Sequence, residues 1–519
     1  MNVRGIVSGL LLASVFFVLG FASPSGRQQR RDRAPELAEY QNALKIQDLA
    51  ARVRELERIK AAYPSTQYGA LIESAILYAR IQMATTVDEV IKLHEPVIRG
   101  ADGMNRVFVF YSFSWDILRH PNAARFDKAK ATRAVLDYVD RGLKLALDPE
   151  FQKTLPADQI PFLEMNRPTF HLAEAAAYIN EGNAPKAAAA LEKFRKSGHA
   201  FDQVYYYILG DLDTARGWEK EALESYLSAA AENYGDALAK ARTLYQKLNG
   251  SLDGFEAKVE DRQRQLPFAL EVYKPDKRWE GKTVLAELFT GSECPPCVGA
   301  DLGFDGLIEA FDSRFLAVLE YHLPIPRPDP MMNQATKRRA REYGVTSTPS
   351  TFFDGEATAG GGGNRSMAGE KFREFGGEVR ARLAEKPAVK LEAKAARAGD
   401  LVRVEFKADK TPSGADFHIA LVQEEERFRG SNGLVFHKMV VREFVTLSEA
   451  AVKGGTYTLD IAAAEAAAAD SLAEFEREMS FRFPVKKDRI DRSALRVVIF
   501  VQDRTTKKVL NAAVAIVPK

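Results

Sequence analysis

The sequence Glu287-Leu-Phe-Thr-Gly-Ser-Glu-Cys294-Pro-Pro-Cys297 contains the only two cysteines of the 519-residue chain. An apolar run, Thr283 to Phe289, leads into it through a short polar turn. This order predicts a strand that ends at the cysteines, followed by a helix that begins there. A helix N-terminus offers unpaired N–H groups and a positive dipole, which lower the pKa of a thiol. The pattern therefore predicts a reactive pair in which Cys294 is the more exposed nucleophile and Cys297 resolves the mixed disulfide.

Two other interpretations of the cysteine pair stay open. A structural zinc site takes four ligands, and the sequence supplies neither a second C-x-x-C nor paired histidines. A purely stabilising disulfide is poorly matched to so short a loop, because closing the loop removes little entropy from the unfolded chain. A redox-active dithiol with no metal and no cofactor is the favoured interpretation.

A second stretch, Tyr343 to Gly355, predicts a turn, an X-Pro bond at Thr348-Pro349, a short strand and an Asp-Gly hairpin turn. With the C-x-x-C motif it resembles the thioredoxin family, in which a cis-proline begins the strand that faces the dithiol. The expected elements also follow that family's order: a strand over 283–289, a helix to about Phe311, a strand Phe315–Tyr321, a helix Asn333–Tyr343, the hairpin, and a helix Met367–Leu383. The resemblance implies an α/β thioredoxin fold over residues 273–386, with Pro349 in the active site.

The resemblance can be narrowed by the residues around the cysteines. E-L-F-T, three residues and C-x-x-C is similar to the motif of a group of exported bacterial thioredoxin-like proteins. Those proteins also have a Tyr-His or similar pair and an Asp-Pro segment, as Tyr321-His322 and Asp329-Pro330 do here. The Pro-Pro between the cysteines instead resembles exported thiol reductases of the cytochrome-maturation type, so the redox partner is left open.

The resemblance implies that a buried carboxylate carries the proton of the second thiol. Glu287 lies seven positions before Cys294 and would take that place if the loop is one residue longer here. Burial of a carboxyl group in a strand raises its pKa, which suits proton transfer near neutral pH. The alternative is that Glu287 faces solvent at the strand edge.

Further residues are predicted to lie beside the dithiol and contact the substrate protein. His322 ends the next parallel strand, so its ring should lie on the same rim as the dithiol and tune the thiolate or contact substrate, unless it only bonds backbone. Thr348, Pro295 and Pro296 are expected to contact substrate, and the two prolines stiffen the turn because they lack N–H groups.

The N-terminal residues predict where in the cell the protein is located, and the composition bears on its partners. Lys and Arg number 73 and Asp and Glu 71, which gives no indication of a nucleic-acid partner. A basic start, an apolar stretch over 6–21 and small residues near Ala22 predict an export signal over 1–22, with a polar linker over 23–34. An uncleaved membrane anchor is the alternative, although about 16 apolar residues fall short of the roughly 20 that span a bilayer. We therefore expect an exported protein of a bacterial periplasm or cell envelope, with membrane contact only through an uncleaved N-terminal segment.

The region 35–272 has apolar residues at three- and four-residue steps, which predicts helices. Two units between Pro168 and Asp236 align at a 35-residue offset, with Gly182 and Ala187 corresponding to Gly217 and Ala222. Tyr206-x-x-Leu209-Gly210, Gly217, Ala222, Tyr226 and Ala229 resemble a tetratricopeptide (TPR) repeat, whose period is 34. The resemblance implies a TPR-like solenoid that binds a protein or peptide on its concave surface. An irregular helical bundle is the alternative.

After Lys386 the pattern changes to alternation, which predicts about seven or eight short strands in an antiparallel β-sandwich over 387–519. The expected strands are 389–391, 401–406, 417–422, 438–444, 456–459, 479–483, 495–501 and 509–517, with one helix over 462–478. His418 and His437 lie on or beside strands without a ligand pattern, so core or edge roles are expected and no metal.

Together these features predict an exported, multidomain thiol–disulfide oxidoreductase whose partners are protein thiols and disulfides. The alternative belongs to another class: a cell-envelope protein-binding scaffold or folding-helper, whose dithiol is a redox sensor or a vestige. Fold alone does not decide between them.

Overall fold

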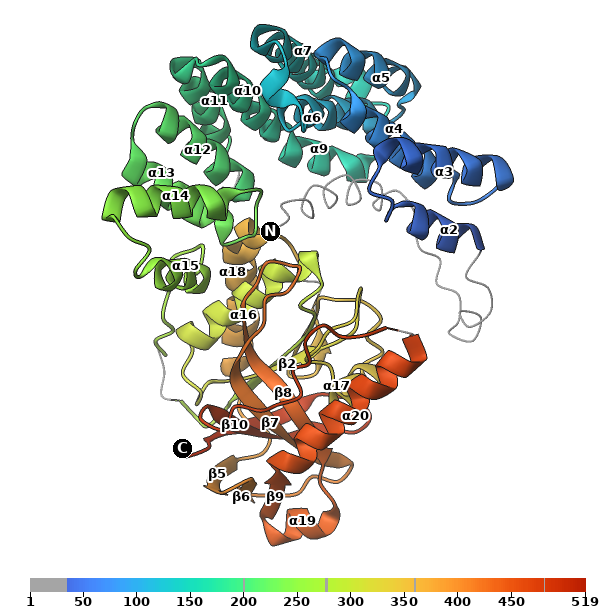
Figure 1. Cartoon of the computed structure of the whole chain (residues 1–519). Coiled ribbons are helices and arrows are strands. Elements are labelled where there is room, and N and C mark those ends of the chain that lie inside the picture. The colour runs from blue at the N-terminus through green and yellow to red at the C-terminus, as the bar shows by residue number, and fades with distance from the viewer. Residues whose placement is uncertain (1–34, 199–200, 276–278, 359–360, 480) are drawn as a thin grey trace. The chain divides into compact units, whose positions relative to one another are not determined.

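The computed structural model describes residues 35–198, 201–275, 279–358, 361–479 and 481–519 (Figure 1). The predicted export signal and linker, residues 1–34, lie outside the described residues. The described residues form two compact units. The helical unit lies within Met1–Ala230 and Tyr234–Leu252, and the sheet unit comprises Ala231–Asn233 and Asp253–Lys519.

The helical unit is built from helices joined by short turns, as the apolar spacing predicts. Its α-helices are α2 (Pro35–Ala43), α3 (Leu49–Ala62), α4 (Gly69–Met83), α5 (Val87–Gly100), α6 (Asn105–Leu118), α7 (Lys128–Leu147), α8 (Pro149–Gln152), α9 (Ile160–Asn166), α10 (Phe170–Glu181), α11 (Ala184–Lys196), α12 (Gln203–Ala215), α13 (Glu219–Ala230) and α14 (Ala237–Asn249). Short 3-10 turns η1 (Ala123–Arg125), η2 (Ala157–Gln159) and η3 (Arg167–Thr169) connect some of them.

The two aligned units of the sequence correspond to two helix pairs, α10 with α11 and α12 with α13. Gly182 and Gly217 stand in the turns at φ 84° and 77°, a region that favours glycine. Ala187 of α11 and Ala222 of α13, each on the second helix of its pair, are fully buried. The helical character of this region is confirmed, and its assignment to the TPR family stays a prediction.

Replacing Gly210 with alanine tests the close approach within the second pair. A Cβ at this position would lie 2.7 Å from the ring of Tyr226, which is itself buried and bonded to Asp211. We expect the free energy of unfolding to fall by about 1 to 3 kcal/mol, because the added methyl group overpacks the contact. Urea denaturation measures this change, with Gly69→Ala as the control, since no described heavy atom outside the adjoining turn of its own helix lies within 4 Å of that Cβ. Equal stability of the two variants would contradict the packing.

The sheet unit contains a mixed eight-stranded sheet in the order β11-β10-β7-β8-β2-β1-β3-β4 and a three-stranded sheet in the order β5-β6-β9. The strands are β1 (Val284–Thr290), β2 (Leu316–His322), β3 (Ser350–Phe353), β4 (Glu356–Ala357), β5 (Leu391–Ala398), β6 (Leu401–Ala408), β7 (Ala415–Arg427), β8 (Phe436–Thr446), β9 (Thr456–Asp460), β10 (Leu495–Asp503) and β11 (Val509–Ile516). β1 and β2 are parallel, β3 is antiparallel to β1, and β2 meets β8 in parallel.

Helices cover the sheets and complete the core. They are α15 (Phe255–Arg264), η4 (Pro295–Cys297), α16 (Val298–Ala310), α17 (Gln334–Glu342), η5 (Arg365–Met367), α18 (Ala368–Leu383), α19 (Glu449–Gly454) and α20 (Ile461–Met479). α16 packs against α18, and both contact β1, so these helices lie over the same part of the sheet (Figure 1). The strands and helices predicted between residues 283 and 383 are confirmed in type and order.

The strands after Lys386 divide between the two sheets. β5, β6 and β9 share an apolar core with β7, β10 and β11, so one sheet packs on the other as in a sandwich. However, β7, β8, β10 and β11 also extend the sheet of the dithiol region, because Glu320 of β2 pairs with Val440 of β8.

The predicted strand over 479–483 is wrong in the described residues. Met479 ends α20, and residues 481–483 follow it outside any strand; residue 480 lies outside the description. The alternating Phe481 and Phe483 pack against Phe475 of α20 and the buried Met332 instead of a neighbouring strand.

Candidate functional site

The two cysteines form a disulfide where the chain passes from β1 into α16. Their Sγ atoms lie 2.07 Å apart, and the Cys297 N–H donates to the Cys294 carbonyl at 3.0 Å. Pro295 and Pro296 are exposed, whereas both cysteines have 0% exposed surface. The expectation that Cys294 is the more exposed thiol is therefore wrong for this state, because neighbouring segments cover both sulfurs.

Thr348 and Pro349 lie beside the disulfide, and the peptide bond between them is cis. The Thr348 hydroxyl oxygen is 3.4 Å from the Cys294 Sγ and donates to the Ile325 carbonyl at 2.9 Å. The Thr348 carbonyl oxygen is 3.7 Å from the same sulfur, within reach of a hydrogen bond from the reduced thiol. The motif of β1 and the hairpin after Tyr343 are thus brought together at Cys294.

Two loops from distant parts of the chain cover the cysteine turn. The Gly363 N–H donates to the Pro296 carbonyl at 2.6 Å. On the other side, the Asn432 N–H donates to the Ser292 carbonyl at 3.2 Å, and the Ser431 N–H donates to the Glu293 carboxylate at 3.2 Å. The sequence indicates loops at both places but carries no signal that they meet the cysteines.

His322 is fully buried at the end of β2, in register with Thr290 of β1. Its Nδ1 lies 3.0 Å from Asp329, whose carboxylate also accepts from the Ser292 N–H at 2.6 Å and the Met331 N–H at 2.8 Å. Burial raises the pKa of Asp329, but the His322 ring and the two N–H groups outweigh it and hold the pKa below its usual value. His322 is therefore connected through Asp329 to the loop before Cys294, and its burial keeps it from a partner in this state.

Glu287 is also fully buried, so the alternative of a solvent-facing strand edge is wrong. Its carboxylate forms an ion pair with Arg339, at 2.9 Å from Nε and 3.1 Å from Nη2. It also accepts hydrogen bonds from the hydroxyls of Tyr321 at 2.9 Å and Tyr343 at 2.6 Å. Four donor atoms, from Tyr321, Arg339 and Tyr343, thus hold this carboxylate, and none of them belongs to a cysteine.

Three further buried carboxyl groups interact with one another: Asp301 and Asp305 belong to α16, and Glu320 belongs to β2. Burial raises the pKa of Asp301 and of Asp305 to about 7. Burial, with the two aspartates nearby, raises the pKa of Glu320 well above its usual value. Asp301 accepts from the Thr290 hydroxyl at 2.6 Å, while Glu320 Oε1 has no hydrogen-bond partner among the described residues. Glu320 is not among the residues predicted from the sequence, although a lone acidic residue in an otherwise apolar strand is a signal that could have found it.

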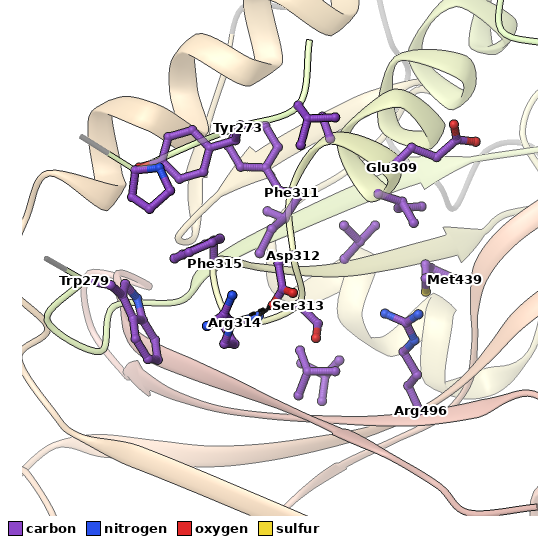
Figure 2. Close-up of a pocket in the computed structure, with 18 of the residues that line it drawn as sticks. Tyr273, Trp279, Glu309, Phe311, Asp312, Ser313, Arg314, Phe315, Met439 and Arg496 are labelled. Atoms are coloured by element: carbon purple, nitrogen blue, oxygen red, sulfur yellow. Dashed lines mark hydrogen bonds and ion pairs between the residues drawn. The ribbon is translucent and has the colours of Figure 1, made fainter. Parts of the chain in front are cut away.

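A cavity of about 640 Å³ opens at the other end of β2 (Figure 2). Tyr273, Phe311 and Phe315 form an aromatic wall, and Met439 and Arg496 line the opposite side (Figure 2). Arg496 is already paired with Glu424 at 2.7 Å. The cavity borders Leu316 and Val318, whereas the cysteines lie near the His322 end of the strand.

His418 and His437 lie on β7 and β8 and are buried. Burial lowers the pKa of both histidines to about 3, so both rings are neutral near pH 7. No group of three or more His, Cys, Asp or Glu side chains within the described residues is arranged to hold a metal ion. In the same residues, no helix combines the length and apolar character of a membrane span.

Comparison of the chain with protein-family models, with curated proteins and with solved structures gives no match.

Proposed function

We propose that the chain is a thiol–disulfide oxidoreductase of thioredoxin type that exchanges disulfides with protein partners. The observation that carries the proposal is the Cys294–Cys297 disulfide at the start of α16, with Thr348 3.4 Å from the Cys294 sulfur. The dipole at the start of α16 favours a thiolate there. The Thr348 carbonyl offers an acceptor for the Cys294 thiol.

The exchange proceeds in two displacements. The Cys294 thiolate attacks a partner disulfide, forming a mixed disulfide while one partner sulfur leaves as a thiolate. The Cys297 thiolate then attacks the Cys294 sulfur, which re-forms the intramolecular disulfide and releases the second partner sulfur. The partner gains two electrons from the two cysteines, and its thiolates take two protons from the cysteine thiols or from water. The reverse sequence oxidises a partner dithiol.

The alternative function is a cell-envelope scaffold or folding-helper with a dithiol that senses redox state or is a vestige. The complete burial of both sulfurs favours it, because a buried disulfide does not react until its surroundings open. The two functions differ in whether a covalent intermediate with a partner forms at Cys294.

Replacing Cys297 with alanine is expected to trap that intermediate. Without the resolving thiol, mixed disulfides through Cys294 accumulate, and they are seen on non-reducing gels and identified by mass spectrometry. Cys294→Ala is the matched control, because it keeps one cysteine but removes the attacking one. Equal adduct from the two variants, or none from Cys297→Ala, contradicts the oxidoreductase and favours the scaffold.

The rest of the proposal concerns location and partner choice. The N-terminal sequence supports export to a bacterial periplasm or cell envelope. The helix pairs α10 with α11 and α12 with α13 support a TPR-like role in binding the partner protein. The sheet unit then supplies the chemistry.

A further inference from the structure

The segment Gly362–Asn364 lies directly on the cysteine turn. The Gly363 N–H donates to the Pro296 carbonyl at 2.6 Å, and the Gly363 carbonyl accepts from the Gly299 N–H at 2.7 Å. Gly363 thus uses both its N–H and its carbonyl group to bond the segment Pro296–Gly299, as a residue in one strand bonds a neighbouring strand. These contacts need no side chain from either segment.

Gly362 fits only because it has no side chain. A Cβ on it would lie 1.9 Å from the Pro296 carbonyl oxygen and 2.7 Å from the Pro349 Cγ. The segment therefore passes between the cysteine turn and the cis-proline, the two features that flank the disulfide. One residue earlier, the Cβ of an alanine at Gly361 would meet no described heavy atom within 4 Å apart from those of its chain neighbours.

We propose that Gly362–Asn364 is a removable cover of the disulfide, and that it occupies the strip where the extended backbone of a partner docks. The docking part rests on the proposed function. A partner segment would replace the cover at the Pro296 carbonyl and the Gly299 N–H, and it would carry glycine or another small residue next to its own cysteine. The conformation with buried sulfurs is then the closed state of the protein, and the cover moves away before exchange begins.

Gly362→Ala tests the cover in the full chain, with Gly361→Ala as the matched control. Dithiothreitol reduces the disulfide: its two thiols give two electrons and two protons to Cys294 and Cys297 and form its own ring disulfide. The added methyl group meets backbone that cannot yield, so the closed state is disfavoured. We expect reduction about tenfold faster or more in Gly362→Ala and an unchanged rate in Gly361→Ala. Equal rates in the two variants would overturn the cover.

A second measurement keeps the native glycines, in case Gly362→Ala does not fold. Glutathione is attached to Cys294 in the Cys297→Ala variant, and amide hydrogen exchange is followed at Gly299 and Gly363. Both amides donate in the closed state, so we expect protection without glutathione and its loss at both positions with glutathione. Protection that survives the adduct contradicts displacement of the cover.

The outcomes separate this inference from the proposed function. If Gly362→Ala speeds chemical reduction but neither it nor the native chain exchanges with a protein disulfide such as insulin, the cover stands and the oxidoreductase fails. If the native chain exchanges but the two glycine variants are reduced equally fast, the oxidoreductase stands and the cover fails.

Discussion

Replacing Arg339 with methionine is expected to lower the free energy of unfolding by about 3 to 5 kcal/mol. Arg339 is 1% exposed, and its guanidinium contacts the Glu287 carboxylate through two nitrogens. Without it, a buried negative charge keeps only the hydroxyls of Tyr321 and Tyr343. Removing one partner of such a pair costs far more than the pair itself contributes, and urea denaturation measures the loss.

Two further variants make this prediction specific. Arg341→Met changes an exposed arginine of the same helix and is expected to alter stability by less than about 0.5 kcal/mol. The double variant Arg339→Met with Glu287→Leu removes both charges, so it should lose less stability than Arg339→Met alone. A double variant as unstable as the sum of its two single variants would show that burial of an unpaired charge is not the cause.

Replacing Asp301 with asparagine is expected to change how stability depends on pH. Burial raises the pKa of Asp301 to about 7, so the native state keeps a proton that the unfolded state loses above about pH 4. Because the native state binds this proton more tightly than the unfolded state does, the contribution of Asp301 to the free energy of unfolding falls as pH rises from about 4 to 7. Asparagine cannot ionise, and its amide oxygen can still accept from the Thr290 hydroxyl. The free energy of unfolding of the variant should therefore rise relative to that of the wild type across this range, by an amount on the order of 2 to 4 kcal/mol.

Glu465 provides a control, because its contribution to stability depends on pH with the opposite sign. Hydrogen bonds from Arg492, chiefly, lower its pKa to about 2, so its ionised form stabilises the native state above the unfolded pKa. Glu465→Gln should destabilise the protein at pH 7, and the difference should close as pH falls towards 2. Denaturant unfolding at several pH values tests both variants. Identical pH profiles for Asp301→Asn and the wild type would contradict the prediction for Asp301.

The local elements of the dithiol region could be predicted because each is bounded by residues with strong backbone preferences. The apolar run that becomes β1 stops at a polar turn, and Asp354-Gly355 turns the chain between β3 and β4. The sheet order could not be predicted in the same way. Alternation indicates which side chains of β8 face a core, but it carries no information that Val440 pairs with Glu320 of β2.

The residues of the candidate site also divide into those that the sequence alone reveals and those that only the fold reveals. The cysteines and Thr348-Pro349 stand out in the sequence because few residue types serve their chemistry and geometry. Arg339, the partner of Glu287, does not stand out in the sequence, because it lies 52 positions away and is one of 73 basic residues. Gly362 resembles its neighbours in a glycine-rich run, and only the folded chain distinguishes the position where a Cβ would strike the Pro296 carbonyl.

The eight-stranded sheet imposes an order on biosynthesis. The Thr283 N–H donates to the Asn511 side chain on β11, and the Arg339 guanidinium donates to Gln502 on β10, so the dithiol region completes these bonds only after both strands are synthesised. Until β8 emerges, the β2 edge that it covers is unpaired and open to another nascent chain. Residues 273–386 are therefore not expected to fold completely alone, and truncation of the chain before β10 and β11 would leave the dithiol region without these bonds.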